Sequence, residues 1–208
     1  LQAVVPALQP YDTVLAIGGC LVALLMWLCT GMIYGCLKFL QEWATPLTPL
    51  SFAIFGLTTG SLVQLATERL LGIHASGIAG FAIGLLVIAG ILKATIFARN
   101  ARLRPKSTLS SATGIPGRIR QISMGTMGGS FNTREFFHGA SSHLLKKMRS
   151  LVLIGAFLGP LVILTLVGFS NVGVVAATLI HAAGMIAERW LFFAQANHPQ
   201  NLYYQKIG

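Results

Sequence analysis

Four polar side chains of different chemistry lie within seven residues of one another, in the middle of the chain. They are Asn132, Arg134, Glu135 and His138, an amide, a guanidinium, a carboxylate and an imidazole. If this segment is helical, Arg134 and His138 are four residues apart and share a face, and Glu135 lies three before His138. Such a group could bind the polar surface of a partner or relay a proton. The equal alternative is a salt bridge that folds the segment onto neighbouring helix ends.

A second group of ionisable residues lies inside the last apolar segment. His181 is near its middle, and Glu188 and Arg189 follow seven and eight residues later on roughly the same side. Ionisable groups within a membrane helix are candidates for function, although the interface tolerates charges near a helix end. A haem with two axial histidines would need a second histidine within the apolar segments. We therefore expect no haem in this chain, because the other histidines fall outside those segments: His74, His138, His143 and His198.

Motifs for other chemistry are absent from the sequence. The glycine-rich runs at 114–117 and 125–129 predict tight turns, but neither has the GK[ST] ending of a P-loop. No residue set resembles a hydrolytic triad or a zinc site. Cys20, Cys29 and Cys36 lack a CxxC pattern and are interpreted as apolar packing residues. We expect no bound metal.

The composition is that of a membrane protein. Hydrophobic residues make up 54% of the 208 residues and charged residues only 10%, whereas a soluble domain has about 25% charged residues. The formal charge of +10 would suggest nucleic acid in a soluble protein. Here the basic residues flank long apolar runs, as in membrane loops, so we predict a lipid bilayer as the partner and no nucleic acid.

The apolar runs predict an all-α fold, a polytopic transmembrane bundle with five membrane helices. Pro160 should kink the fourth helix, and Lys93, near the end of the third, should extend its side chain to the interface. The predicted helices cover residues 12–40, 50–66, 78–98, 151–169 and 172–193.

A basic polar stretch, residues 99–149, separates the first three apolar segments from the last two. It holds ten of the fifteen Lys and Arg residues. The positive-inside rule therefore places this stretch and the C-terminus in the cytoplasm. Arg69, in the link predicted to lie outside, is the exception.

Several segments resemble a known family of membrane subunits. The chain looks like the membrane anchor (DmsC-type) of dimethyl sulfoxide reductase, most closely the SoeC-like branch that accompanies sulfite-oxidising molybdoenzymes. The most specific match is residues 131–139, reading FNTREFFHG. The other matching segments are residues 30–34, 39–47, 119–125, 128–130 and 184–193.

This resemblance implies an anchor of about eight helices in the bacterial cytoplasmic membrane. The five spans of residues 1–208 would form one integral membrane unit, the C-terminal part of that anchor. Its implied partners are a molybdopterin catalytic subunit and an iron–sulfur subunit, with which it would exchange electrons for the quinone pool. Menaquinone or ubiquinone would be an exchangeable substrate, without haem or metal in the anchor. The family's known quinol-site residues, a His and an acid, would precede Leu1 and match no position here.

The function has two redox interpretations, which differ in the direction of electron flow, and one interpretation without redox activity. Quinone reduction coupled to sulfite oxidation is our first expectation. Quinol oxidation by a DMSO- or polysulfide-type reductase anchor is the alternative, and a fragment of a transporter without redox activity is a further one.

Candidate quinone-binding residues lie where the first two spans approach the basic side. A quinone needs an apolar slot, a polar group at each carbonyl oxygen and a proton donor. Anchoring of the helix at the interface is the competing interpretation. The candidates are Tyr34, Gln41, Glu42 and Trp43, with Glu135 and His138 from the polar stretch.

The polar stretch 99–149 is predicted to dock the catalytic partners. Phe131, Phe136 and Phe137 would be apolar anchors, because buried aromatic and Arg side chains dominate interface energies. The polar groups around them would be Arg118, Arg120, Asn132 and Arg134.

Overall fold

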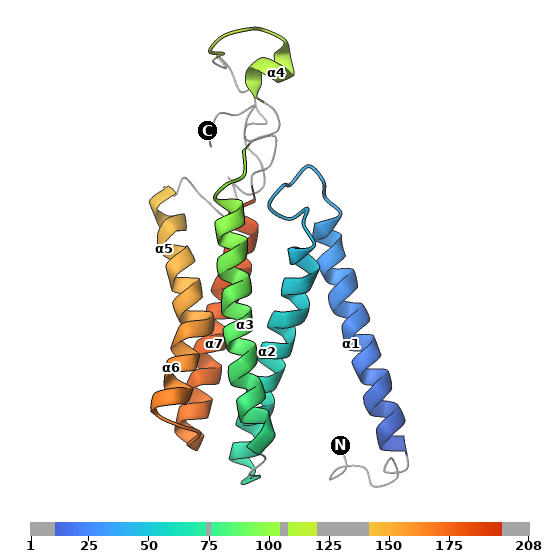
Figure 1. The fold of residues 1–208 in the computed structure, drawn as a ribbon, viewed down its shortest axis with the longest axis vertical. Coiled ribbons are helices and arrows are strands. Elements are labelled where there is room, and N and C mark those ends of the chain that lie inside the picture. The colour runs from blue at the N-terminus through green and yellow to red at the C-terminus, as the bar shows by residue number, and fades with distance from the viewer. Residues whose placement is uncertain (1–10, 74–75, 105–107, 120–141, 197–208) are drawn as a thin grey trace, which may run out of the picture.

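The computed structural model of the protein describes residues 11–73, 76–104, 108–119 and 142–196, and every regular element in these ranges is a helix (Figure 1). The elements in chain order are α1 (Asp12–Gly35), α2 (Leu47–Leu70), α3 (Ser76–Asn100), α4 (Leu109–Thr113), α5 (Ser142–Leu153), the π-helix η3 (Ile154–Leu158), α6 (Gly159–Leu166) and α7 (Asn171–Ala194).

Five helices are long and apolar enough to cross a membrane, which confirms the predicted all-α bundle of five spans. The fourth span is composite, because α5, η3 and α6 follow one another without a break. We call the end of the bundle that carries the α1–α2 link and the C-termini of α3 and α7 the basic end. Lys38, Arg99, Arg102, Lys147 and Arg149 lie there.

The predicted end of the first span, near residue 40, is wrong, because α1 stops at Gly35. The chain then turns, with Leu40 N–H donating to the Leu37 carbonyl and Trp43 N–H to the Leu40 carbonyl. These turns bury Leu40 and Trp43 against α7. Leu40 and Trp43 therefore line the interior of the bundle and do not prolong the membrane helix.

The remaining predicted bounds differ at the helix ends. α2 begins three residues before the predicted start and runs four residues beyond the predicted end, with Pro49 in its first turns. Proline is tolerated there, because the first N–H groups of a helix have no intrahelical acceptor. The fourth span begins within α5 and ends at Leu166, three residues before the predicted end.

α1 packs closely on α2 only near the basic end. A Cβ atom on Gly31 would lie 2.5 Å from Pro49 Cα, and one on Gly56 would lie 2.7 Å from the Trp27 ring. Toward its N-terminus α1 diverges from the other helices (Figure 1). Its large apolar side chains, such as Leu21 and Leu25, are exposed there, as expected for a surface that faces lipid.

The other membrane helices pack around a continuous interior, with α2 and α7 in contact with each other. One buried cluster includes Leu62, Leu86 and Val174, at the end opposite the basic end. A middle cluster contains Phe55, Ala89, Ala156 and Phe157. Near the basic end Phe97, Val152 and Leu191 form a third.

At Pro160, where a kink was predicted, the structure has a π-helix, η3, directly before the proline. Proline has no N–H and its ring collides with the carbonyl of the residue four before it, here Ala156. A single π turn is a common way to accommodate such a conflict. At the level of η3 the helices are very close, because a Cβ on Gly184 of α7 would lie too near the Ala156 nitrogen for any side chain.

We expect Gly184→Ala to destabilise the bundle by about 1–3 kcal/mol, the usual cost of overpacking. The added methyl group would meet backbone atoms of Gly155 and Ala156, which cannot rotate away. Thermal unfolding in detergent would measure the effect. Gly80→Ala is the matched control, because a Cβ there meets nothing within 4 Å and alanine is the better helix former. Equal melting temperatures for the two variants would contradict the prediction.

Candidate functional site

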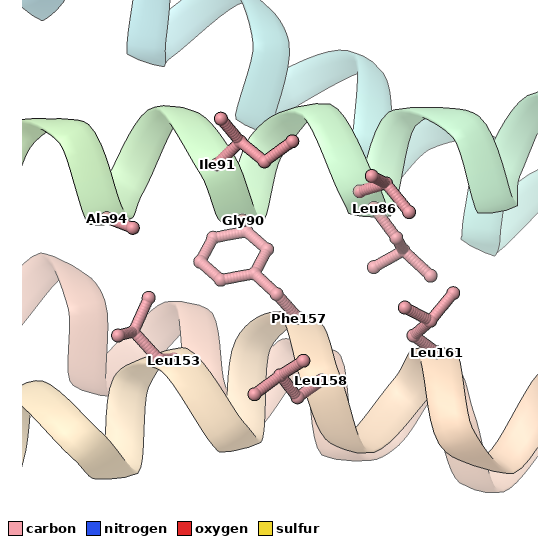
Figure 2. A pocket seen from close by; sticks show the side chains of 9 residues that line it. Leu86, Gly90, Ile91, Ala94, Leu153, Phe157, Leu158 and Leu161 are labelled. Carbon is pink, nitrogen blue, oxygen red and sulfur yellow. The ribbon is translucent and has the colours of Figure 1, made fainter.

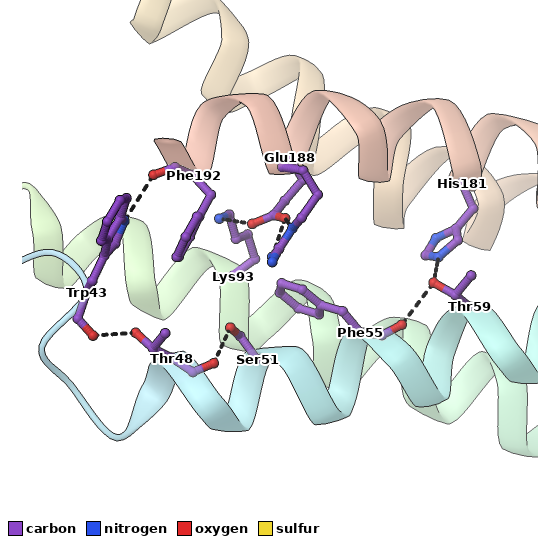
Figure 3. A network of polar contacts seen from close by, with 10 residues as sticks. Trp43, Thr48, Ser51, Phe55, Thr59, Lys93, His181, Glu188 and Phe192 are labelled. Atoms are coloured by element: carbon purple, nitrogen blue, oxygen red, sulfur yellow. Dashed lines mark hydrogen bonds and ion pairs between the residues drawn. The ribbon is translucent and has the colours of Figure 1, made fainter. Parts of the chain in front are cut away.

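A buried ion cluster joins α3 and α7 within the bundle (Figure 3). Lys93 Nζ lies 2.5 Å from Glu188 Oε1, and Arg189 Nε lies 2.5 Å from Glu188 Oε2. The side chains of Lys93 and Glu188 are each 1% exposed, and that of Arg189 is 32% exposed. We call these three residues the ion cluster. Its formal charge is +1, because two cations share one carboxylate.

The expectation that the Lys93 side chain extends to the interface is therefore wrong. Lys93 lies seven residues before the end of α3, about 10 Å along the helix axis. Its side chain points inward to Glu188, which is likewise buried. Isolated charges are very costly in hydrocarbon, and pairing offsets much of that cost.

Aromatic rings surround the two cations. The Arg189 guanidinium lies 4.5 Å from the Phe52 ring centroid and 5.1 Å from that of Phe192. Lys93 Nζ lies 4.7 Å from the Phe97 centroid. Cation–π contacts of this kind favour a charged group without introducing another ion.

The rings near Arg189 belong to a larger aromatic cluster at the basic end, made of Tyr34, Trp43, Phe52, Phe192 and Phe193. Trp43 stacks on Phe192 at 5.0 Å, and Tyr34 stacks on Phe52 at 5.9 Å. Trp43 Nε1–H donates to the Phe192 carbonyl over 3.1 Å. The aromatic cluster thus joins the α1–α2 link to α7 and lies against Arg189.

His181 forms a separate polar site in the middle of α7. Its Nδ1 lies 2.6 Å from the Ala156 carbonyl oxygen and its Nε2 lies 3.0 Å from Thr59 Oγ1. A carbonyl only accepts hydrogen bonds, so Nδ1 carries a proton. Thr59 has a single hydroxyl proton, for which Nε2 of the neutral ring competes with the Phe55 carbonyl oxygen, 2.9 Å from Oγ1. Pro160 explains the first contact, because it has no N–H to donate to Ala156 in an α-helix.

The structure brings together two of the residues predicted to bind a quinone, Tyr34 and Trp43. Gln41 lies in the turn before Trp43, where its carbonyl accepts from Arg99 Nη2 over 2.9 Å. Glu42 is partly exposed in the same turn. Arg118 is exposed in the segment after α4. The other predicted site residues lie outside the described residues: Arg120, Phe131, Asn132, Arg134, Glu135, Phe136, Phe137 and His138.

Sequence reasoning missed the pairing of Lys93 with Glu188. The available signal was one cation in the third apolar segment and one acid in the fifth. Opposite charges in two different spans of one bundle lower their burial cost by meeting, so this pattern favours a contact.

An apolar groove of about 290 Å³ lies between α3 and the composite fourth span (Figure 2). Leu86, Gly90 and Ile91 line one side, and Leu153, Phe157 and Leu161 line the other. None of its lining side chains is polar, so the groove can take a hydrocarbon chain but cannot bind a carbonyl oxygen.

The five spans and the buried ion cluster define a polytopic membrane protein with paired charges inside its bundle. The chain is 39% identical over 204 residues to the C subunit of the sulfite dehydrogenase of Allochromatium vinosum. That match covers 95% of this chain and 62% of the relative, so the chain spans less than two thirds of the relative's length. The likeness supports the sulfite-oxidising branch predicted from the sequence. No family model and no solved structure matches the chain.

Proposed function

We propose that this protein is the membrane subunit of a sulfite-oxidising complex and passes electrons from an iron–sulfur subunit to membrane quinone. The observation that carries the proposal is the 39% identity over 95% of the chain to a protein named as the C subunit of a sulfite dehydrogenase. The five apolar spans fit a subunit that holds its partners at the membrane. A molybdopterin subunit would oxidise sulfite, with the basic end of the bundle facing the cytoplasm.

The quinone ring would bind at the basic end, against the aromatic cluster. Tyr34 and Phe52 are partly exposed members of the cluster, and quinone rings pack well on such surfaces. The Arg189 guanidinium, stacked on Phe52, would donate to a carbonyl oxygen. Trp43 has a packing role in this arrangement, because its N–H already binds the Phe192 carbonyl. Gln41 and Glu42 border the region from the α1–α2 link.

Purification of the chain with its bound partners tests this proposal. We expect molybdenum and iron to copurify, and sulfite to reduce an added quinone analogue. A complex that lacks this subunit should oxidise sulfite with a soluble artificial acceptor but not with quinone. Isolation as a lone polypeptide without molybdenum or iron would overturn the proposal, and solute uptake by liposomes that contain it would favour a transporter.

A further inference from the structure

We propose that the Lys93–Glu188 pair transfers protons to the quinone. These protons would reach the pair from the basic end, along the faces of α3 and α7 that carry the two residues. This inference rests on the proposed function, since it assigns the protons that quinone reduction takes up. A quinone that gains two electrons binds two protons, one at each oxygen. A quinone site inside a bilayer therefore needs a proton-carrying group and a path to water.

The ion cluster is one side chain away from the aromatic cluster. Arg189 contacts Glu188 through its Nε–H and contacts Phe52 and Phe192 with the face of its guanidinium. Its Nη2 is buried and lies 2.5 Å from Glu188 Oε2, so the guanidinium faces the carboxylate with two of its nitrogens. A reduced quinone oxygen that accepts from Arg189 would thus lie beside Glu188. The net positive charge of the ion cluster would stabilise that oxygen.

Two buried polar atoms, one on α3 and one directly after α7, lie between the Lys93–Glu188 pair and the basic end. Asn100 follows Lys93 by seven residues, and Gln195 follows Glu188 by seven residues. Residues seven apart lie on the same helix face, about 10 Å along the axis. Asn100 Nδ2 and Gln195 Oε1 are buried and have no hydrogen-bond partner among the described residues, as is also true of Arg149 Nε. Buried polar atoms without protein partners are typical binding sites for water.

The proton balance follows from this arrangement. Electrons from the iron–sulfur subunit reduce the quinone, and its oxygen becomes negative beside Arg189. A Lys93 N–H bond breaks as its proton passes to Glu188, and the Glu188 O–H bond breaks as the quinol O–H bond forms. Lys93 then regains a proton from water at the basic end, past Asn100 and Gln195. A second passage supplies the other proton.

A variant that retains the ion pair but cannot release a proton distinguishes a proton-transfer role of Lys93 from a purely structural role. Lys93→Arg retains the positive charge opposite Glu188, but a guanidinium does not release its proton in proteins. We expect the purified complex to retain sulfite oxidation with a soluble acceptor, while its quinone-coupled turnover falls at least tenfold. Glu68→Gln is the matched control, because Glu68 is an acid of α2 at the opposite end of the bundle. It should leave both rates unchanged.

Two further measurements complete the test. Lys93→Met/Glu188→Leu replaces the pair with apolar side chains of similar volume, a change that bundles often tolerate, and should show the same tenfold loss. Glu188→Asp should retain part of the rate and show a solvent deuterium isotope effect larger than in the wild type, as expected when proton transfer limits turnover. Wild-type quinone rates in both Lys93 variants would overturn the inference and leave the proposed function intact. A wild-type complex that cannot reduce quinone would overturn the proposed function itself.

Discussion

Glu188→Leu is expected to lose about 3–5 kcal/mol of folding free energy, because it leaves two cations near one another without their carboxylate. Most of this cost comes from the charge of Lys93, since its side chain is 1% exposed and Glu188 Oε1 is its ion partner. Unfolding by a denaturing detergent, followed by helical circular dichroism, would measure the change.

The double variant Lys93→Met/Glu188→Leu is the control for this prediction. It removes the unpaired ammonium and should recover more than half of the lost stability, because an apolar pair can replace a buried ion pair. The two effects are then strongly non-additive, as expected of residues in contact. A Glu188→Leu variant as stable as the wild type would show that Lys93 does not need its partner.

In the complex proposed above, Phe136→Ala/Phe137→Ala is expected to release the catalytic subunits from the membrane. Aromatic anchors contribute about 2 kcal/mol or more each to an interface, so losing two weakens binding roughly a thousandfold. Sulfite oxidation with a soluble acceptor should move from the membrane pellet to the supernatant. Phe81→Ala, at an exposed aromatic on the apolar surface of α3, should leave the activity in the pellet. If the double variant retained the subunits, the polar stretch would contact only other parts of this chain, and the docking prediction would be wrong.

Hydropathy was sufficient to predict the five spans, because each is an apolar run near the length that the bilayer requires. It misplaced the end of α1, since the apolar residues Leu37, Phe39 and Leu40 continue the hydrophobic run past Gly35. Leu40 is apolar because it is buried against α7. A hydropathy pattern does not distinguish a side chain buried in protein from one that faces lipid.

The ion cluster was less predictable, because its geometry depends on how two helices are rotated about their axes. Lys93 alone fits a side chain that extends to the interface, and Glu188 alone fits a helix end. Their contact requires both to face the same interior. His181 was recognised as unusual from its position, but its two partners come from α2 and η3, far from it in the sequence.

The close contact at Gly184 determines the azimuth of α7. Its bare Cα rests on the backbone of Gly155 and Ala156, so α7 cannot spin about its axis without driving a neighbouring side chain into that backbone. Each residue of a helix advances by about 100°. One residue inserted between Gly184 and Glu188 would therefore swing the carboxylate a quarter turn or more away from Lys93, while the glycine contact on the other side of the insertion stayed in place. The Gly184 contact thus fixes the rotation of α7 about its axis, and with it the direction in which each charged side chain further along α7 points.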